Sequence, residues 1–124
     1  MCPVYINRIA SIHAESRNEK PYFSAQEPDY KEMITNANLR RRMSRMIKMG
    51  VACGLECLKD IPSEKVDAII TATGLGCLAD TEKFMNALMD NREQMLNPTA
   101  FIQSTFNTVG AQLALLLKIC LLYT

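Results

Sequence analysis

Five cysteines and a single histidine are the side chains of this chain most suited to metal binding or nucleophilic chemistry. Cys53 and Cys57 are four residues apart, so both thiols fall on one face of a helix. A zinc site would need two further ligands, and the other thiols and His13 have no paired spacing. We therefore expect Cys53 and Cys57 to be structural, and we predict no metal site.

Cys77 is the thiol best placed for reactivity, because it follows a glycine-rich turn and precedes a predicted helix. A helix N-terminus favours the thiolate of such a cysteine. Nucleophilic catalysis would also need a base, and nothing places His13 beside Cys77. We favour a packed turn cysteine and an exposed loop histidine, so these side chains supply no catalytic residue.

The turn at Gly74 and Gly76 has only a superficial likeness to nucleotide-binding loops. It lacks the third glycine of GxGxxG, and no GxxxxGK[ST] sequence occurs in the chain. No catalytic triad or paired-carboxylate site is recognisable either. We therefore predict no cofactor-binding residue and no cofactor.

Composition predicts one globular domain over residues 1–124. The net charge of +1 gives no global field for nucleic acid or an acidic membrane. The N-terminus lacks the pattern of a secretory signal, so reduced thiols and a cytoplasmic location are expected. The apolar run 113–122 contains Lys118 and is too short to span a bilayer.

Residues 66–76, VDAIITATGLG, are the stretch around which the other elements are expected to be arranged. Their β-branched, apolar run predicts a strand covered on both faces by helices. Asp80 or Thr81 is expected to cap the helix that follows. The predicted fold class is α/β, with helices layered on this strand.

The remaining elements follow from periodicity and helix breakers. Pro21 and Pro28 forbid a continuous helix in the polar stretch 11–31, which we interpret as a surface excursion. The predicted elements are a strand at 4–6, helices at 37–59, 80–91 and 106–118, a turn at 97–99 and an extended or irregular link at 100–105.

The predicted helix 37–59 combines an inward face with a basic first half. Gly50 and Gly54 would allow close contact with a neighbouring element. The inward face is expected to hold Leu39, Met43, Met46, Gly50, Cys53 and Cys57. The basic residues are either a solvated flank with salt bridges or a docking patch for an acidic partner: Arg40, Arg41, Arg42, Arg45 and Lys48.

Three stretches, in register, resemble the β-ketoacyl synthase family. LRRRMSRMIKMG at 39–50 is similar to the start of a family helix, and AIITATGLGCLADTEKF at 68–84 to a strand ending in a glycine-rich turn. NPTAFIQSTFNTVGAQLALLL at 97–117 is similar to a helix on the dimer-facing, acyl-pocket side of that fold. The likeness covers about residues 27–118 and fits the short N-terminal domain of bacterial condensing enzymes, including those of aryl-polyene-type pathways.

The resemblance implies the N-terminal part of a thiolase-like layered α/β fold, incomplete in this chain. Family members are dimers that condense an acyl chain on a cysteine with malonyl carried by acyl carrier protein. The family's nucleophilic cysteine is expected beyond the helix ending near Lys118, and its two catalytic histidines belong to the C-terminal half, so the resemblance assigns no catalytic residue here. It implies an acyl-pocket or dimer surface at Phe101, Phe106, Asn107 and Gly110, and a carrier-protein patch at Arg40, Arg41, Arg42 and Arg45.

Three functional hypotheses remain open. The chain is a condensing-enzyme domain without activity alone, a non-catalytic subunit that pairs with a complete synthase or with itself, or an inactive gene remnant. Residues 101–117 discriminate between the last two, because a partner would bury this apolar surface and a remnant would leave it exposed.

Overall fold

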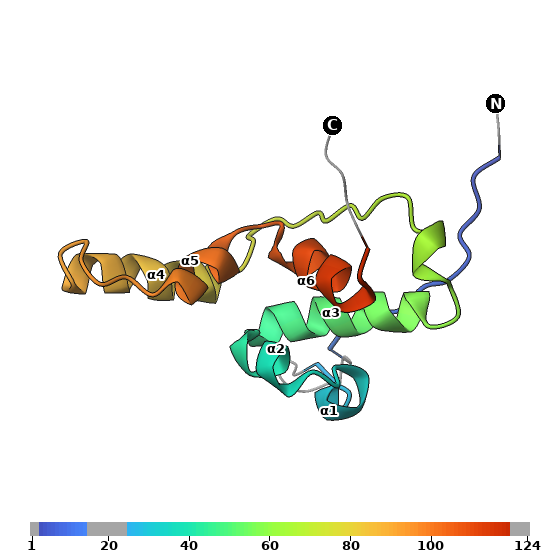
Figure 1. Cartoon of the computed structure of the whole chain (residues 1–124), viewed down its shortest axis with the longest axis horizontal. Helices are drawn as coiled ribbons and strands as arrows, with labels where there is room; N and C mark the ends of the chain where they lie inside the picture. Colours follow the sequence, from blue (N-terminus) through green and yellow to red (C-terminus); the bar gives the residue numbers. More distant parts are fainter. Residues whose placement is uncertain (1–2, 15–24, 120–124) are drawn as a thin grey trace, which may run out of the picture.

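The computed structural model describes residues 3–14 and 25–119, and within these residues it is helical without a strand. An isolated antiparallel bridge joins Ala14 to Ala25. Figure 1 shows the arrangement of the helices. They are α1 (Tyr30–Met33), α2 (Ala37–Arg42), α3 (Arg45–Leu58), the 3₁₀ helix η1 (Ser63–Lys65), α4 (Leu78–Asp90), α5 (Pro98–Ser104) and α6 (Thr108–Leu117).

The two segments predicted as strands, 4–6 and 66–76, are not paired with a neighbouring strand in the described residues. Residues 66–76 run between η1 and α4 as a long connection over α6 (Figure 1). Residues 4–6 are likewise unpaired and exposed. A strand is defined by a ladder with a neighbour, and no such neighbour lies beside either segment within the described residues. The α/β layering is therefore not confirmed.

The prediction of a single helix over residues 37–59 is wrong, because the helix is interrupted at Met43 and Ser44. Met43 is extended, with φ −76° and ψ 133°, and Ser44 begins α3 with φ −69° and ψ 170°. The break changes which side chains face inward, so Met46 is 56% exposed whereas Ile47 and Val51 are fully buried. The inward face expected from the spacing was therefore wrong at Met46.

Helix starts differ from prediction at two places. The predicted turn and link at 97–105 are in fact α5, which Asn97 caps through its side chain and Pro98 begins at the first position. Cys77, rather than Asp80 or Thr81, is the N-cap of α4, without a side-chain cap hydrogen bond. Asp80 is instead buried in the first turn, where a carboxylate is favoured by the helix dipole. The helices α4 and α6 otherwise match their predicted positions.

The body of the molecule, which we define as α1, α2, α3 and α6, holds the hydrophobic core. The helices α3 and α6 pack together at two glycines of α3. A Cβ atom added to Gly50 would lie 2.8 Å from Cγ1 of Val109, and one added to Gly54 would overlap Leu113. The expectation of close contact at these glycines is confirmed. The buried core residues are Ile34, Met43, Ile47, Val51 and Leu113, and Cys77, the N-cap of α4, packs with them.

The arm, which we define as α4 and α5, is a helical hairpin that extends away from α1, α2 and α3 (Figure 1). Its two helices meet through Phe84 and Phe101, whose ring centroids are 5.5 Å apart. At the junction with α6 the chain bends by 105°. Thr108 is buried at this bend, where its hydroxyl donates to the Ile102 carbonyl at 2.5 Å and lies 2.8 Å from Oγ1 of Thr105.

No single helix in residues 3–14 and 25–119 combines the length and apolar composition needed to cross a membrane. The bent pair α5 and α6 meets the length and composition criteria only when the two helices are taken together.

Candidate functional site

The basic surface on α1, α2 and the start of α3 consists of Lys31, Arg40, Arg41, Arg42, Arg45 and Lys48. Arg40, Arg41 and Arg42 occupy the last turn of α2, where cations are favoured by the helix dipole. Arg40 also donates from Nη1 to the Ile34 carbonyl at 2.5 Å, which fastens α2 to the C-terminal end of α1. Arg41 donates to the Asn38 side chain at 3.3 Å.

Arg45 stands apart from the other three predicted patch residues. Its Nε lies 2.5 Å from Oε1 of Glu27, whose Oε2 accepts a hydrogen bond from the Tyr30 hydroxyl at 2.6 Å. The Tyr30 hydroxyl and Arg45 together hold the pKa of Glu27 below its usual value. In the part of the chain that the structure describes, Arg40, Arg41 and Arg42 make no ion pair. The predicted patch therefore divides into a compensated Arg45 and three uncompensated arginines.

A shallow hollow of about 290 Å³ lies within this basic surface. Lys31 and Lys48 join two of the arginines there, and Asp29 contributes one carboxylate, which caps α1. Sequence reasoning missed Lys31, because it did not predict α1. The Asp29 cap was the local signal for that helix. The lining residues are Pro28, Asp29, Tyr30, Lys31, Arg40, Arg41 and Lys48.

The four residues predicted for an acyl-pocket or dimer surface differ in exposure. Phe101 is 56% and Phe106 73% exposed, and Asn107 is exposed at the start of α6. Gly110 is buried instead, because Oγ1 of Thr71 and Cγ2 of Ile69 lie against it. The two phenylalanines thus belong to an open surface, whereas Gly110 belongs to the packing of α6.

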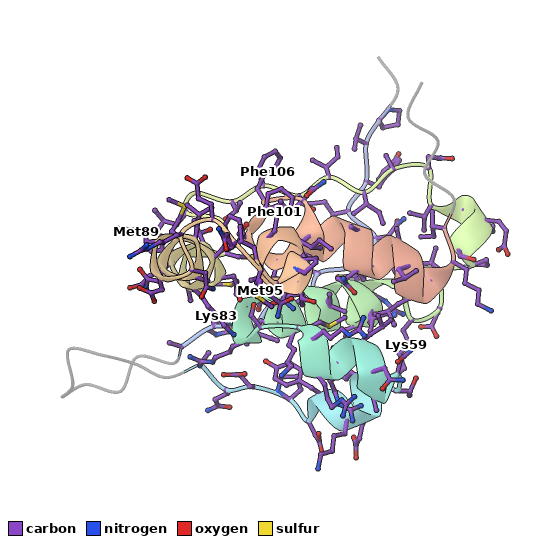
Figure 2. All side chains as sticks on the ribbon, turned by 60° about the vertical axis from the view of Figure 1, so that its left-hand side comes forward. Lys59, Lys83, Met89, Met95, Phe101 and Phe106 are labelled. Atoms are coloured by element: carbon purple, nitrogen blue, oxygen red, sulfur yellow. The ribbon has the colours of Figure 1, made fainter. Side chains whose placement is uncertain are left out.

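Several large apolar side chains on the arm and at its junction with α6 are exposed, and the sequence analysis predicted only the two phenylalanines among them. The side chain of Phe106 projects away from the ribbon (Figure 2). Methionines on α4 and in the following loop add to the surface, with Met89 72% and Met95 98% exposed. The residues of this arm surface are Met85, Met89, Met95, Phe101, Ile102 and Phe106.

The described thiols are those of Cys53, Cys57 and Cys77, and all three are at least half-buried. Burial, followed by the nearby carboxylate of Asp80, raises the pKa of Cys77. Cys77 is buried at the turn before α4, so the predicted packed turn cysteine is confirmed. Cys53 and Cys57 are half-buried, and burial also raises the pKa of Cys53.

His13 is exposed, as predicted, and its Nδ1 lies 3.3 Å from Oγ of Ser11. Cys53 opens onto a second hollow, of about 450 Å³, beside Ser11 and Glu56. Among the described residues, no three histidine, cysteine, aspartate or glutamate side chains are grouped as metal ligands would be.

Comparison with family models gives a match to the model described as "Beta-ketoacyl synthase, N-terminal domain", over residues 13–121. Comparison with the curated proteins and with the solved structures finds no match.

Proposed function

This chain belongs to the family of β-ketoacyl synthase N-terminal domains, and from that membership we propose a role in the decarboxylative condensation of acyl chains with malonyl-acyl carrier protein. The pathway class is fatty acid or polyene and polyketide biosynthesis, in the cytoplasm. The contribution of this chain is to bind the carrier protein, without catalytic activity of its own. The uncompensated basic surface is the observation on which this proposal rests.

Electrostatic complementarity supports a carrier protein as the ligand of the basic surface. Acyl carrier proteins are acidic, and a surface of one charge steers an oppositely charged partner into contact. Arg41 and Arg42 are exposed and make no ion pair in the described part of the chain. Arg45 is not part of the proposed contact, because Glu27 already neutralises it.

The environment of the thiols supports a role without chemistry. A nucleophilic cysteine needs a lowered pKa or an adjacent base. The pKa of Cys77 is instead raised, because the thiol is buried. The exposed His13 has a hydroxyl, Ser11, as its hydrogen-bond neighbour.

Titration of ¹⁵N-labelled acyl carrier protein with this chain tests the proposal. We expect shifts on the acidic face of the carrier, and at least a tenfold weaker affinity for the double substitution Arg41→Glu and Arg42→Glu. The matched control is the double substitution Lys59→Glu and Lys83→Glu, which makes the same charge change elsewhere (Figure 2). Lys59 follows α3, and Lys83 lies on α4. If both double substitutions weakened the affinity equally, the attraction would come from net charge alone. That result would contradict a defined docking surface.

A second candidate function is pairing with a complete synthase subunit, and the exposed arm surface favours it. Phe106 is 73% and Met95 98% exposed, and several large apolar side chains exposed on neighbouring helices, unlike a single one, are typical of an interaction surface. Size-exclusion chromatography with light scattering, of the chain alone and mixed with a complete synthase subunit, would test pairing. A stoichiometric complex supports this function, whereas soluble aggregate without a complex supports the gene remnant.

A further inference from the structure

Two thiols lie about one helical turn apart on α3, and the proposed function uses neither of them. Cys53 and Cys57 are both free and half-buried. Side chains four residues apart on a helix share one face, with Cβ atoms about 5–6 Å apart. Burial raises the pKa of Cys53 and the nearby Cys57 thiol raises it further, whereas a hydrogen bond from the Ile12 backbone lowers it. The two thiols therefore interact and form a pair.

A third sulfur-bearing side chain lies near this pair, on the short helix α1. Cys53 lines the hollow of about 450 Å³, and Met33 lines the same hollow. Helix α1 packs on α3, and the Met33 side chain is half-buried against the core. Ala10, Ile12 and Ala52 contribute apolar walls. The hollow thus brings a thioether to the same wall space as the Cys53 thiol and gives an ion a path to it.

A guanidinium lies next to the Cys57 end of the pair. Arg8 donates from Nη1 to the Glu56 carbonyl at 3.5 Å, and its Nη2 lies 2.5 Å from Oδ2 of Asp60. Asp60 raises the pKa of Arg8 most, and Glu56 and the Cys57 thiol raise it further. This cation is therefore placed to offset negative charge at Cys57, in competition with Asp60.

We propose that Cys53 and Cys57 bind one Cu(I) ion as thiolates, with the thioether of Met33 as a third and weaker ligand. Binding forms a Cu–S bond to each cysteine and releases the two S–H protons to solvent. The copper remains Cu(I), so the step needs no oxidant or reductant. Two thiolates and one Cu(I) carry one negative charge in total, and Arg8 is the neighbouring cation. The inference is independent of the proposed function and uses neither the basic surface nor the arm surface.

The number and kind of these ligands favour Cu(I) over zinc. Thiolate and thioether sulfurs are soft ligands that select Cu(I), and two or three of them complete its coordination. Structural zinc needs four ligands, and among the described residues no third cysteine, histidine or carboxylate joins Cys53 and Cys57. The expectation that these thiols are structural took only the four ligands of zinc into account.

The spacing of the two cysteines suits one shared ion. Metal–thiolate bonds are about 2.3 Å long, so an ion between two thiolates holds their sulfurs at most about 4.6 Å apart. Side chains on one helical face with Cβ atoms about 5–6 Å apart can reach that separation. The backbone of α3 therefore needs no change to bring both sulfurs to the ion.

Anaerobic titration of the full chain with Cu(I), against the competing chelator bathocuproine disulfonate, tests the proposal. We expect one copper per chain in native mass spectrometry. Cys53→Ser and Cys57→Ser should each weaken the affinity by at least about tenfold. The matched control is Cys77→Ser, which removes a thiol outside the pair and should leave the affinity unchanged. Unchanged affinity in the double substitution Cys53→Ser and Cys57→Ser would overturn the proposal.

Met33→Leu and Met46→Leu are a second matched pair of variants. Each replaces a methionine by a side chain of similar size, but Met46 is 56% exposed and lies outside the hollow. Met33→Leu should weaken the affinity less than either cysteine variant does, and Met46→Leu should not change it. Equal affinities in the two variants would remove Met33 from the site.

Alkylation of the unmodified chain gives a readout that does not depend on the folding of a variant. Cu(I) should protect Cys53 and Cys57 together from iodoacetamide, whereas an equal concentration of Zn(II) should protect neither. Peptide mass spectrometry identifies the modified cysteines. Absence of protection by Cu(I), or equal protection by Zn(II), would overturn the proposal.

Discussion

The body and the arm of this molecule are both helical, but they differ in what their side chains bury. The body contains the three largest fully buried side chains, Ile34, Ile47 and Val51. In the arm, α4 buries Asp80 alone and α5 buries no residue completely. The arm is held together by partial contacts such as Phe84 with Phe101.

The difference separates the stability of the chain from its capacity to bind. Buried apolar area stabilises a fold roughly in proportion to its extent, at about 25 cal/mol per Å². The body therefore supplies most of the free energy of folding, and it also carries the basic surface. The arm leaves large side chains in water, which is typical of a surface that a partner covers.

The largest expected effect comes from deleting a buried side chain of the body. Ile47→Ala leaves a cavity in the core, where Ile47 is fully buried, and should reduce the free energy of unfolding by about 3 kcal/mol. Met89→Ala, in the arm, should change it by less than about 0.5 kcal/mol, because Met89 is 72% exposed. Urea denaturation of both variants measures the contrast. Similar losses would mean that the arm contributes to the core as strongly as the body.

A glycine pair gives the next largest contrast. Gly54→Ala would drive a methyl group into Leu113, which is buried and has little room to move. The overlap should cost about 1–3 kcal/mol, partly offset by the better helix propensity of alanine, about 1 kcal/mol. Gly74→Ala is the control, since no atom lies within 4 Å of its added Cβ. A stabilised Gly54→Ala variant would contradict the close packing of α3 on α6.

The junction between arm and body should respond more weakly. Thr108→Val removes the hydroxyl that donates to the Ile102 carbonyl, at a cost of about 1 kcal/mol. Thr108→Ser is the control, because it keeps the donor and loses only a methyl group. Amide hydrogen exchange should show faster opening of α5 in the valine variant than in the serine variant. Equal exchange in the two variants would assign the 105° bend to packing rather than to this hydrogen bond.

Local patterns predicted the isolated helices and the glycine contacts, whereas the break at Met43 and the missing ladder depend on tertiary context. The sequence 37–59 contains no proline, and its apolar periodicity does not indicate a break at Ser44. The α5 helix could have been predicted, because Asn97 followed by Pro98 is a helix-start signal. Pairing of residues 66–76 depends on a neighbouring strand, which no local pattern specifies.

The candidate site likewise combines features that local patterns predict with features that depend on tertiary contacts. The basic character of Arg40, Arg41 and Arg42 is evident from their sequence positions alone. The pairing that removes Arg45 from that surface is not evident from the sequence, because its partner Glu27 lies 18 residues earlier, before α1 and α2. An ion pair between residues distant in the sequence can be recognised only once the tertiary contact between them is known.

The smallest expected effect concerns this ion pair, and it is a change in pH dependence. The pKa of Glu27 is lowered in the folded chain from an ordinary value of 4.5, by the Tyr30 hydroxyl and then by Arg45. Such a group stabilises the fold above its unfolded pKa, and the contribution is lost as the pH falls through the folded pKa. Glu27→Gln should therefore flatten the decline of stability below about pH 4.5 and leave the shape of the profile near pH 7 unchanged. Arg45→Gln should reproduce only part of this flattening, because the Tyr30 hydrogen bond remains. Thermal unfolding between pH 3 and 7 measures both variants, and an unchanged slope for Glu27→Gln would show that solvent screens the pair completely.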